Sequence, residues 1–524
     1  MRTWHLGWLS VLVFVGWPSF FSGAALASTA DHSTFKELQQ DFKSGPEVTQ
    51  ACLKCHTEAA KQVMKTPHWT WEYLNPATEQ KLGKKHVLNN YCVSVEANLP
   101  FCTTCHAGYG WKDKQFDFSK QENVDCLICH DTSGKYRKQP GLAGHPPVKA
   151  MEFPPGSGKI VKPVDLKTVA QSVAKTSRDT CGACHFSGGG GDGVKHGDMD
   201  SSLAAPEANV DIHMDVTGLD FSCATCHKTE GHAVPGSRYA PTAKDDQGKG
   251  MRGKVDGRNP ATCQSCHGND AHKVARLNSH ANKIACQTCH IPKFARGGIV
   301  TKLSWDWSTA GKKDKDGKPL TIKDAKGNVI YDGKKGDFVV AENVVPEYKW
   351  FNGKVNYTLL SDKIDNKRVV PVNWTDGSPD DGKSLIWPFK IMRGKQPYDP
   401  VNMTLVKPHT AGDNNTAYWK YLDWEKSITA GMASAGQDYS GKYDFIETEM
   451  SWPITHMVAP KDEALGCVDC HAKDSRLAKI PGIYMPSHHA NPLLDLFGWG
   501  IAGLAFLGVI GHGAGRIYAA RKGK

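Results

Sequence analysis

The pattern Cys-x-x-Cys-His occurs eight times in this chain, and no other feature constrains the fold as strongly. Two thiols at this spacing can form thioethers to the two vinyl groups of one haem, and the adjacent histidine then binds the iron as its proximal ligand. The pattern therefore predicts eight covalently bound c-type haems, each with its iron. In chain order, motifs one to eight are Cys52/Cys55/His56, Cys102/Cys105/His106, Cys126/Cys129/His130, Cys181/Cys184/His185, Cys223/Cys226/His227, Cys263/Cys266/His267, Cys286/Cys289/His290 and Cys467/Cys470/His471.

Other uses of cysteine do not fit this arrangement. Disulfides, zinc sites and thioredoxin-like redox pairs would leave some cysteine pairs without an adjacent histidine. Of the 17 cysteines, only Cys92 lies outside the motifs. An unpaired thiol in an exported protein is either buried and inert or reactive and poised for chemistry, and these two alternatives stay open for Cys92.

The two ends of the chain predict export and membrane attachment. Residues 1–27 combine Arg2, a mostly apolar run and a small-residue cleavage site, which is typical of a signal peptide. Residues 496–515 are almost uninterrupted apolar sequence followed by Lys and Arg, which predicts a transmembrane anchor and short cytoplasmic tail over 491–524. The alternative is a buried C-terminal helix. We expect residues 28–490 to lie on the periplasmic side of a bacterial inner membrane.

The spacing of the motifs and turns predicts the internal organisation. Seven motifs lie between Cys52 and His290, where periodicity is poor and Gly and Pro are frequent. We expect a mainly α multihaem cytochrome c fold with much irregular structure, wrapped around eight haems. Residues 297–452 contain no motif but several Asp-Gly and Asn-Gly turns, which predict a small β-hairpin-rich insertion or cap. A solvated insertion without catalytic role is the alternative.

The net charge of +10 does not indicate a nucleic-acid partner. Part of this charge lies in the signal and the tail, and the two propionates of each haem offset much of the rest.

Histidines outside the motifs are the candidates for the second axial position of each iron. An iron with histidine on both sides transfers electrons and leaves no vacant position for a substrate. Spacing does not show which histidine faces which iron. The predicted distal ligands are His68, His196, His213, His232, His272, His280 and His456; further histidines are His32, His86, His145, His409, His488 and His489.

Three segments beside the motifs make the chain similar to a known family. They are Asn89 to Cys92 before motif two, GGGGDGVKHGD after motif four, and LNSHANKIACQTCHIPKFARGG around motif seven. With the eight motif spacings, they resemble the octahaem tetrathionate reductase family of multihaem cytochromes over Cys52 to Tyr484. The tail helix is a departure, because the best-known type of member is soluble.

The resemblance implies that the haem of motif two has Lys195 as its distal ligand. Asp192, Asn89 and Cys92 would line the same pocket, and the other seven haems would have two histidines each. It further implies a respiratory reductase of small anions or nitrogen oxides: tetrathionate, nitrite or hydroxylamine. Its electron donor would be a quinol-oxidising cytochrome or membrane subunit.

Elementary chemistry agrees with this expectation. A buried lysine can bind iron as a neutral amine and, once displaced, can hold an anion or donate a proton as ammonium. A thiolate at Cys92 could attack the central S–S bond of tetrathionate. The competing hypotheses are a non-catalytic, membrane-anchored electron conduit and an enzyme of the hydroxylamine-oxidising type. The latter needs a tyrosine cross-linked to its haem, and no motif identifies one.

Overall fold

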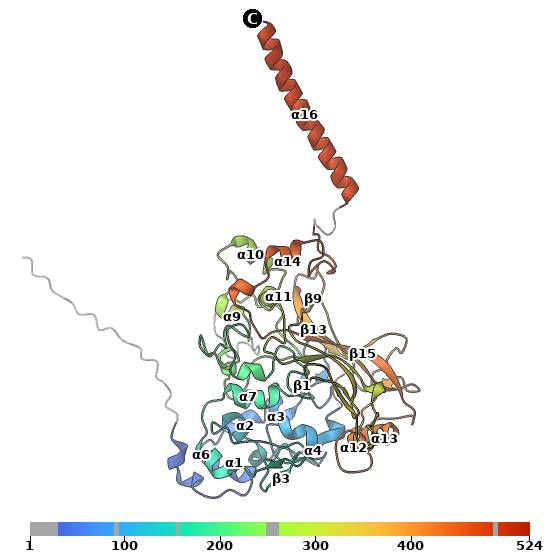
Figure 1. Cartoon of the computed structure of the whole chain (residues 1–524). Coiled ribbons are helices and arrows are strands. Elements are labelled where there is room, and N and C mark those ends of the chain that lie inside the picture. Colours follow the sequence, from blue (N-terminus) through green and yellow to red (C-terminus); the bar gives the residue numbers. More distant parts are fainter. Residues whose placement is uncertain (1–29, 89–93, 154–156, 248–260, 486–490, 524) are drawn as a thin grey trace, which may run out of the picture.

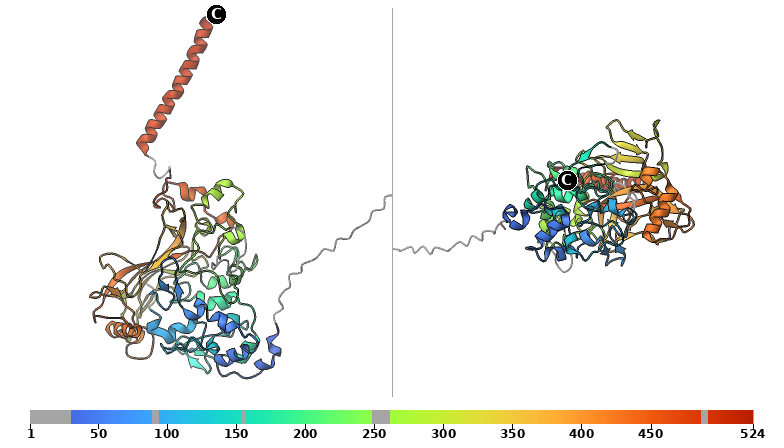
Figure 2. Two further views of the ribbon diagram at one scale, coloured as in Figure 1. Left: turned by 180° about the vertical axis from the view of Figure 1, so that it is seen from behind. Right: turned by 90° about the horizontal axis from the view of Figure 1, so that it is seen from below.

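A computed structural model gives the arrangement of the chain and describes residues 30–88, 94–153, 157–247, 261–485 and 491–523. The helices that carry the motifs are stacked along one side, and a β-sheet covers the other (Figure 1). The C-terminal helix α16 projects from the pole formed by α10 and α14, whereas α1 and α6 lie at the opposite pole, as the reverse view also shows (Figure 2).

Short helices dominate the motif-bearing part, as the sequence predicts. Side-chain caps fix where some begin: the Ser44 hydroxyl accepts from Glu47 N at α1, and Ser177 with Thr180 forms a capping box at α7. The α-helices are α1 (Gly45–Cys52), α2 (Ala59–Val63), α3 (Pro67–Thr70), α4 (Leu99–Cys102), α5 (Leu127–His130), α6 (Leu166–Gln171), α7 (Arg178–His185), α8 (Cys223–Cys226), α9 (Gln264–His267), α10 (Ala275–His280), α11 (Cys286–His290), α12 (Tyr418–Tyr421), α13 (Trp424–Ala435), α14 (Cys467–His471) and α16 (Pro492–Lys522). The 3-10 helices are η1 (His32–Thr34), η2 (Lys36–Leu38), η3 (Glu96–Asn98), η4 (Thr103–Cys105), η5 (Gln121–Asn123), η6 (Ser201–Ala204), η7 (Trp307–Thr309) and η8 (Lys461–Glu463).

The interval without motifs forms a nine-stranded sheet in the order β11-β15-β13-β5-β8-β7-β6, with β9 and β14 also paired to β13. β13 is antiparallel to β15 from Phe389↔Pro453 to Tyr398↔Asp444 and parallel to β5. The strands of this sheet are β5 (Thr301–Asp306), β6 (Thr321–Lys323), β7 (Val329–Asp332), β8 (Gly336–Ala341), β9 (Glu347–Phe351), β11 (Val370–Pro371), β13 (Leu385–Asp399), β14 (Thr404–Leu405) and β15 (Asp444–Pro453). Three two-stranded ladders comprise β1 (Tyr73–Leu74) with β2 (Lys81–Leu82), β3 (Met151–Glu152) with β4 (Ile160–Val161), and β10 (Val355–Tyr357) with β12 (Asn373–Thr375).

This sheet corrects the expectation of a small β-rich cap. β13 is 15 residues long and almost entirely buried. It forms the centre of the largest apolar cluster, which includes Phe351, Trp387 and Phe389. A strand buried on both faces needs packing layers on both sides. The interval is therefore a principal core of the molecule, and the solvated-insertion alternative is wrong.

Buried polar contacts join the sheet region to the motifs. The Asn98 side chain, just before motif two, donates to Pro408 O and accepts from the backbone N–H groups of Thr410 and Ala411. Next to motif seven, Thr288 Oγ1 donates to Ile386 O at 2.7 Å. Because buried polar groups are costly to leave unpaired, these contacts fix two motifs relative to the sheet.

The C-terminal helix is long and apolar enough to cross a bilayer. α16 has 31 residues, a most apolar stretch of mean hydropathy 2.0, and no buried residue. Asn491 caps its N-terminus by accepting from Leu493 N and Leu494 N. The structure therefore has the predicted helix and not the buried alternative.

Candidate functional site

Seven of the eight motif histidines face a second histidine. In each pair, 5.9 to 6.4 Å separates the two ring centroids. Metal–imidazole bonds are roughly 2 Å long, and the ring centre lies about 1 Å beyond its nitrogen, so an iron between two imidazoles separates the centroids by roughly 6 Å. The pairs are His56–His32, His130–His232, His185–His68, His227–His456, His267–His213, His290–His272 and His471–His280.

Hydrogen bonds orient many of these rings for iron. Nδ1–H of His130 donates to Ala174 O and Nδ1–H of His227 to Pro235 O, each at 2.8 Å. The opposite nitrogen, Nε2, then carries the lone pair that an iron needs. The Nδ1 atoms of four distal histidines are engaged in the same way: His232 by Gln62, His272 by Asn278, His280 by Arg276 and His456 by Asp198. The residues present therefore fit seven haem irons with two histidines each.

The predicted histidines fall into clear groups. His68, His213, His232, His272, His280 and His456 all face motif histidines. His196 instead packs edge-on against the Trp452 ring, with centroids 4.7 Å apart. His32 is the partner of His56. It was named among the histidines outside the motifs but not among the predicted distal ligands. The other histidines contact protein groups: His86 pairs with Glu72, His145 stacks on Tyr109 and His409 contacts Thr416. His488 and His489 lie outside the described residues.

Cys55, in motif one, lies in a turn at the molecular surface. Cys55 and the adjacent His56 are both exposed, whereas Cys52 of the same motif is only partly exposed. The physical reason is local: α1 ends at Cys52, and a turn at the molecular surface follows, in which Cys55 N donates to Cys52 O at 3.1 Å and His56 N to the same oxygen at 2.9 Å. A haem held by motif one would therefore lie at the surface, and the thioether of Cys55 stays a prediction.

Exposure is shared by some other motif cysteines, which lie on the outer side of their motif turns. It does not weaken the haem prediction, because a thioether needs the thiol to reach a vinyl group at the haem edge and does not need it to be enclosed by protein. The other exposed motif cysteines among the described residues are Cys129, Cys226, Cys266 and Cys467.

His106, in motif two, is the exception among the motif histidines. Among the residues that the structure describes, no histidine ring pairs with it; five aromatic rings surround it instead: Trp69, Trp71, Trp111, Phe116 and Phe118. Nε2–H donates to Trp69 O at 2.7 Å, and the buried Nδ1 has no hydrogen-bond partner. Burial lowers the pKa of His106 to about 3, so the ring is neutral, as an axial ligand must be. The nitrogen left with a lone pair is Nδ1.

A buried charge network fixes the backbone of motif two. Lys138 Nζ donates to His106 O at 2.7 Å and to Gly108 O at 3.2 Å, and pairs with Asp125 at 3.0 Å. Tyr109 and Tyr136 each donate a hydroxyl proton to the Asp125 carboxylate. A buried ion pair is tolerated only when its remaining donors and acceptors are satisfied. The Lys138–Asp125 network meets that condition. The spacing of the motifs did not predict this network.

Lys195 lies within electrostatic reach of motif two. Its side chain is buried, with 6% of the residue exposed. The pKa of the Cys105 thiol is lowered to about 5, first by a hydrogen bond with Cys184 and then by the charges of Lys84, Lys138 and Lys195. A Cβ at Gly189 would lie 2.1 Å from Lys195 Cε. The glycine at position 189 therefore makes room for the lysine side chain.

Lys390, on β13, fixes the backbone of the lysine segment. Its fully buried Nζ donates to Val194 O and Lys195 O, each at 2.8 Å, and to Thr301 Oγ1 at 2.5 Å. Burial lowers the pKa of Lys390 well below its usual value, while three acceptors match the three donors of its ammonium form. The sequence analysis did not identify Lys390, because only the tertiary fold brings its side chain to the backbone of Lys195.

Of the other predicted pocket residues, Asp192 alone lies within the described part of the chain. The Asp192 carboxylate accepts from the backbone N–H and the hydroxyl of Ser201, and its role toward Lys195 stays a prediction. Asn89 and Cys92 lie outside the described residues.

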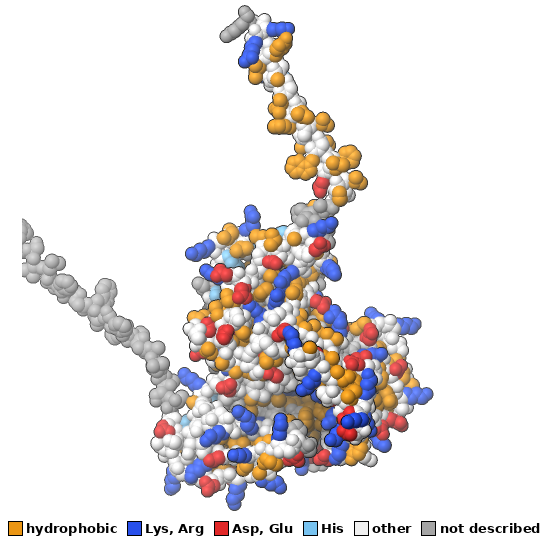
Figure 3. Space-filling view, in the orientation of Figure 1, with side chains coloured by type: hydrophobic (Ala, Val, Ile, Leu, Met, Phe, Trp, Pro, Cys, Tyr) orange, Lys and Arg blue, Asp and Glu red, His pale blue; other side chains and the backbone are white. Residues whose placement is uncertain are grey.

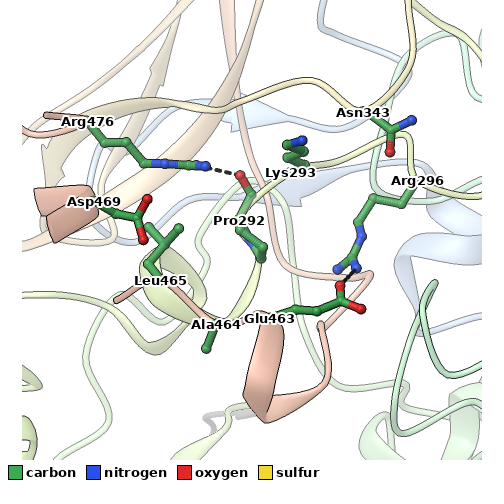
Figure 4. Close-up of a pocket in the computed structure, with 9 residues that line it drawn as sticks. All are labelled: Pro292, Lys293, Arg296, Asn343, Glu463, Ala464, Leu465, Asp469 and Arg476. Atoms are coloured by element: carbon green, nitrogen blue, oxygen red, sulfur yellow. Dashed lines mark hydrogen bonds and ion pairs between the residues drawn. The ribbon is translucent and has the colours of Figure 1, made fainter. Parts of the chain in front are cut away.

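A charged cavity of ≈ 400 Å³ lies between motifs seven and eight (Figure 4). Arg476 donates to Pro292 O, and Arg296 pairs with Glu463. The second terminal nitrogen of Arg296, Nη1, is buried without a hydrogen-bond partner. A carboxylate such as a haem propionate would satisfy it, so this cavity too fits the predicted cofactor.

Comparisons with known proteins decide the family. Residues 302–474 match the family described as "Cytochrome c bacterial", and residues 32–131 match "Cytochrome c554 and c-prime". The crystal structure of octahaem cytochrome c from Shewanella oneidensis is 40% identical, with a TM-score of 0.75, and the match covers 89% of this chain and 98% of that one. The chain is a multihaem c-type cytochrome of the octahaem family. No curated protein sequence matches significantly.

As a member of this family, the chain has covalently bound haem c and a redox role. The match over residues 302–474 spans nearly the whole interval without motifs. In this cytochrome, the sheet therefore belongs to the family fold.

His272→Ala is expected to open one axial position, because His272 faces His290 with 5.9 Å between the ring centroids. Electron paramagnetic resonance of the oxidised cytochrome should show one new high-spin haem. His145→Ala is the matched control and should leave the spectrum unchanged, since that ring stacks on Tyr109. Identical spectra for the two variants would contradict the pairing.

Lys390→Met is expected to lower the free energy of unfolding by roughly 2–4 kcal/mol, because two buried carbonyl groups lose a donor. It should also alter the spectrum of the haem at motif two, since the Lys195 backbone is released. Lys395→Met, on the same strand but partly exposed, should change stability by less than about 0.5 kcal/mol. Equal melting curves and spectra for the two variants would refute the positioning role.

Proposed function

We propose that this cytochrome is a periplasmic, membrane-anchored reductase of small anions or nitrogen oxides, with eight haems. The substrates would be tetrathionate, nitrite or hydroxylamine. One observation carries the proposal: seven motif histidines face a second histidine, whereas His106 does not and has the buried Lys195 nearby. Seven iron sites are thus suited to electron transfer, and one is suited to a displaceable ligand.

When bound, haem c would supply an iron that changes oxidation state. His106 would hold this iron as a neutral imidazole. Lys195 would cap the other face as a neutral amine. Once displaced, the amine takes up a proton and becomes an ammonium that can hold an anion or return the proton.

Positive side chains make this site attractive to anions. Lys84, Lys138 and Lys195 all lie close enough to act electrostatically on Cys105. Lys138 is neutralised by Asp125, whereas Lys84 lies over the Trp71 ring at 5.0 Å from its centroid. A hollow with Lys and Arg side chains near its rim opens where Figure 1 places α4 and β1 (Figure 3). Such a field raises the local concentration of anionic substrate.

For tetrathionate, we propose that the thiolate of Cys92 attacks the central S–S bond. The step forms a Cys92 thiosulfate adduct and releases one thiosulfate. Two electrons then cleave the new S–S bond, which restores the thiolate and releases the second thiosulfate. Asn89 and Asp192 would complete the pocket.

Lys195→Ala is expected to reduce the turnover of all three substrates by about 10²-fold, because the variant lacks the proton donor and the cation. It should nevertheless bind small ligands at the opened iron, which absorption spectra would show. Lys195→His should keep the position closed, because imidazole is not easily displaced. Lys326→Ala, at an exposed lysine, is the control. Full activity in Lys195→Ala would contradict the role of Lys195, whereas no turnover of any of the three substrates by the parent would favour the non-catalytic conduit.

Cys92→Ser should impair tetrathionate reduction by at least 10-fold more than the reduction of nitrite or hydroxylamine, because only the sulfur substrate uses thiol–disulfide exchange. Steady-state assays with a reduced dye measure all three rates, and intact mass checks that haem content is unchanged. An equal loss on all three substrates would make Cys92 a structural residue.

A further inference from the structure

Motif eight is tied to the membrane-length helix by a short piece of chain. Cys470 packs against a cluster that contains Leu477, Ile480 and Met485, and α16 begins at Pro492. The six residues between Met485 and Pro492 span at most roughly 25 Å when fully extended. The haem attachment at Cys470 therefore lies within roughly 30 Å of the start of α16, whatever direction that helix takes.

The other end of the molecule lies much farther from this tether. A domain of roughly 460 residues is about 60 Å across. α1 and α4, which contain cysteines of motifs one and two, lie toward the pole opposite α10 and α14 (Figures 1 and 2). Motif two therefore lies far from motif eight, toward the end of the domain opposite α10 and α14.

Motif eight is also exposed. Cys467 is exposed, and the adjacent Val468 is 75% exposed. Leu277 on α10, which carries the partner histidine His280, and Val274 just before that helix are exposed as well. Both cysteines of motif seven, in contrast, are only partly exposed. At this pole, a partner would therefore reach the haem of motif eight.

Neighbouring cysteines connect motif eight to motif two. Thiols of different motifs lie within hydrogen-bonding or electrostatic reach, so the haems bonded to them would be neighbours. From motif eight to motif two, Cys470–Cys289 and Cys266–Cys226 lie within electrostatic reach, and Cys286–Cys263, Cys223–Cys181 and Cys184–Cys105 lie within hydrogen-bonding reach. A side branch leaves motif four through Cys181–Cys129 and continues by Cys126–Cys52 to motif one.

We propose that motif eight is the site of electron uptake, and that the donor is a membrane-embedded, quinol-oxidising protein that docks at the α10/α14 pole. This inference rests on the proposed function and names the partner of that reductase. Each quinol oxidised by the partner gives a quinone, two protons and two electrons. The two electrons reduce two ferric irons, the first of them at motif eight, and pass along motifs seven, six, five and four to motif two.

A protein donor fits better than free quinol. The quinol ring stays within the bilayer, whereas motif eight belongs to the domain outside it. Every residue of α16 is unburied, and Gly511 and Gly515 form the small-xxx-small spacing that favours close packing of two membrane helices. A helix of the donor would pack there.

The test moves the anchor to the opposite pole. Truncation after Asn491 removes α16, and Ala25→Leu with Ala27→Leu blocks cleavage so that the N-terminal apolar segment becomes the anchor. That segment joins the domain at η1, near α1 and α6 (Figure 1). In native membranes supplied with a short-chain quinol, haem reduction is followed by absorbance. We expect the N-anchored form to be reduced at least 10-fold more slowly than the parent, although reduced viologen reduces both at the same rate.

Equal quinol-driven rates for the two anchored forms would overturn the assignment of motif eight. Equally fast reduction of the parent in protein-free vesicles would overturn the protein donor. His280→Met provides a second check, because a thioether ligand raises the haem potential; it should shift one potential and change the quinol-driven rate. The matched variant His145→Met, at a ring that stacks on Tyr109 and pairs with no motif histidine, should change neither a haem potential nor that rate. Failure of dye-driven tetrathionate turnover would refute the proposed function alone, since haem reduction is measured separately.

Discussion

The pairing of histidines from distant parts of the chain is the constraint on which the rest of the structure depends. His68 faces His185, and His227 faces His456. Bringing such segments together costs loop entropy that grows only slowly with loop length. An iron bonded to both rings would offset this cost and would couple haem attachment to folding. Such coupling would explain how short helices and small apolar clusters suffice in the motif-bearing part.

The sheet provides a packed protein core beside motif two. β13 carries Lys390, which bonds to the backbone of Val194 and Lys195. Asn98, next to motif two, is bonded to residues 408–411. Both contacts lie near motif two, whose His106 faces no second histidine among the described residues. If Lys195 is displaced there as proposed, these contacts would keep its surroundings fixed.

The sequence predicted whatever depends on local pattern. The motifs, the short helices, the turns of the sheet region and the apolar helix α16 are all encoded by neighbouring residues. The histidine partners were only partly predictable: His196 was predicted as a distal ligand and His32 was not, yet tertiary packing brings His32 to His56. The extent of the sheet was underestimated, since β13 is a buried strand without the alternation that indicates an exposed face. Lys390 and the Lys138–Asp125 pair are long-range contacts that no local pattern indicates.

The central claim is that one iron differs from the other seven. Magnetic circular dichroism of the oxidised, fully loaded protein distinguishes axial ligand pairs and tests this claim most directly. The account predicts seven bis-histidine signals of equal intensity and one further low-spin signal of a haem with a nitrogen ligand other than a second histidine. Eight indistinguishable bis-histidine signals would contradict the account.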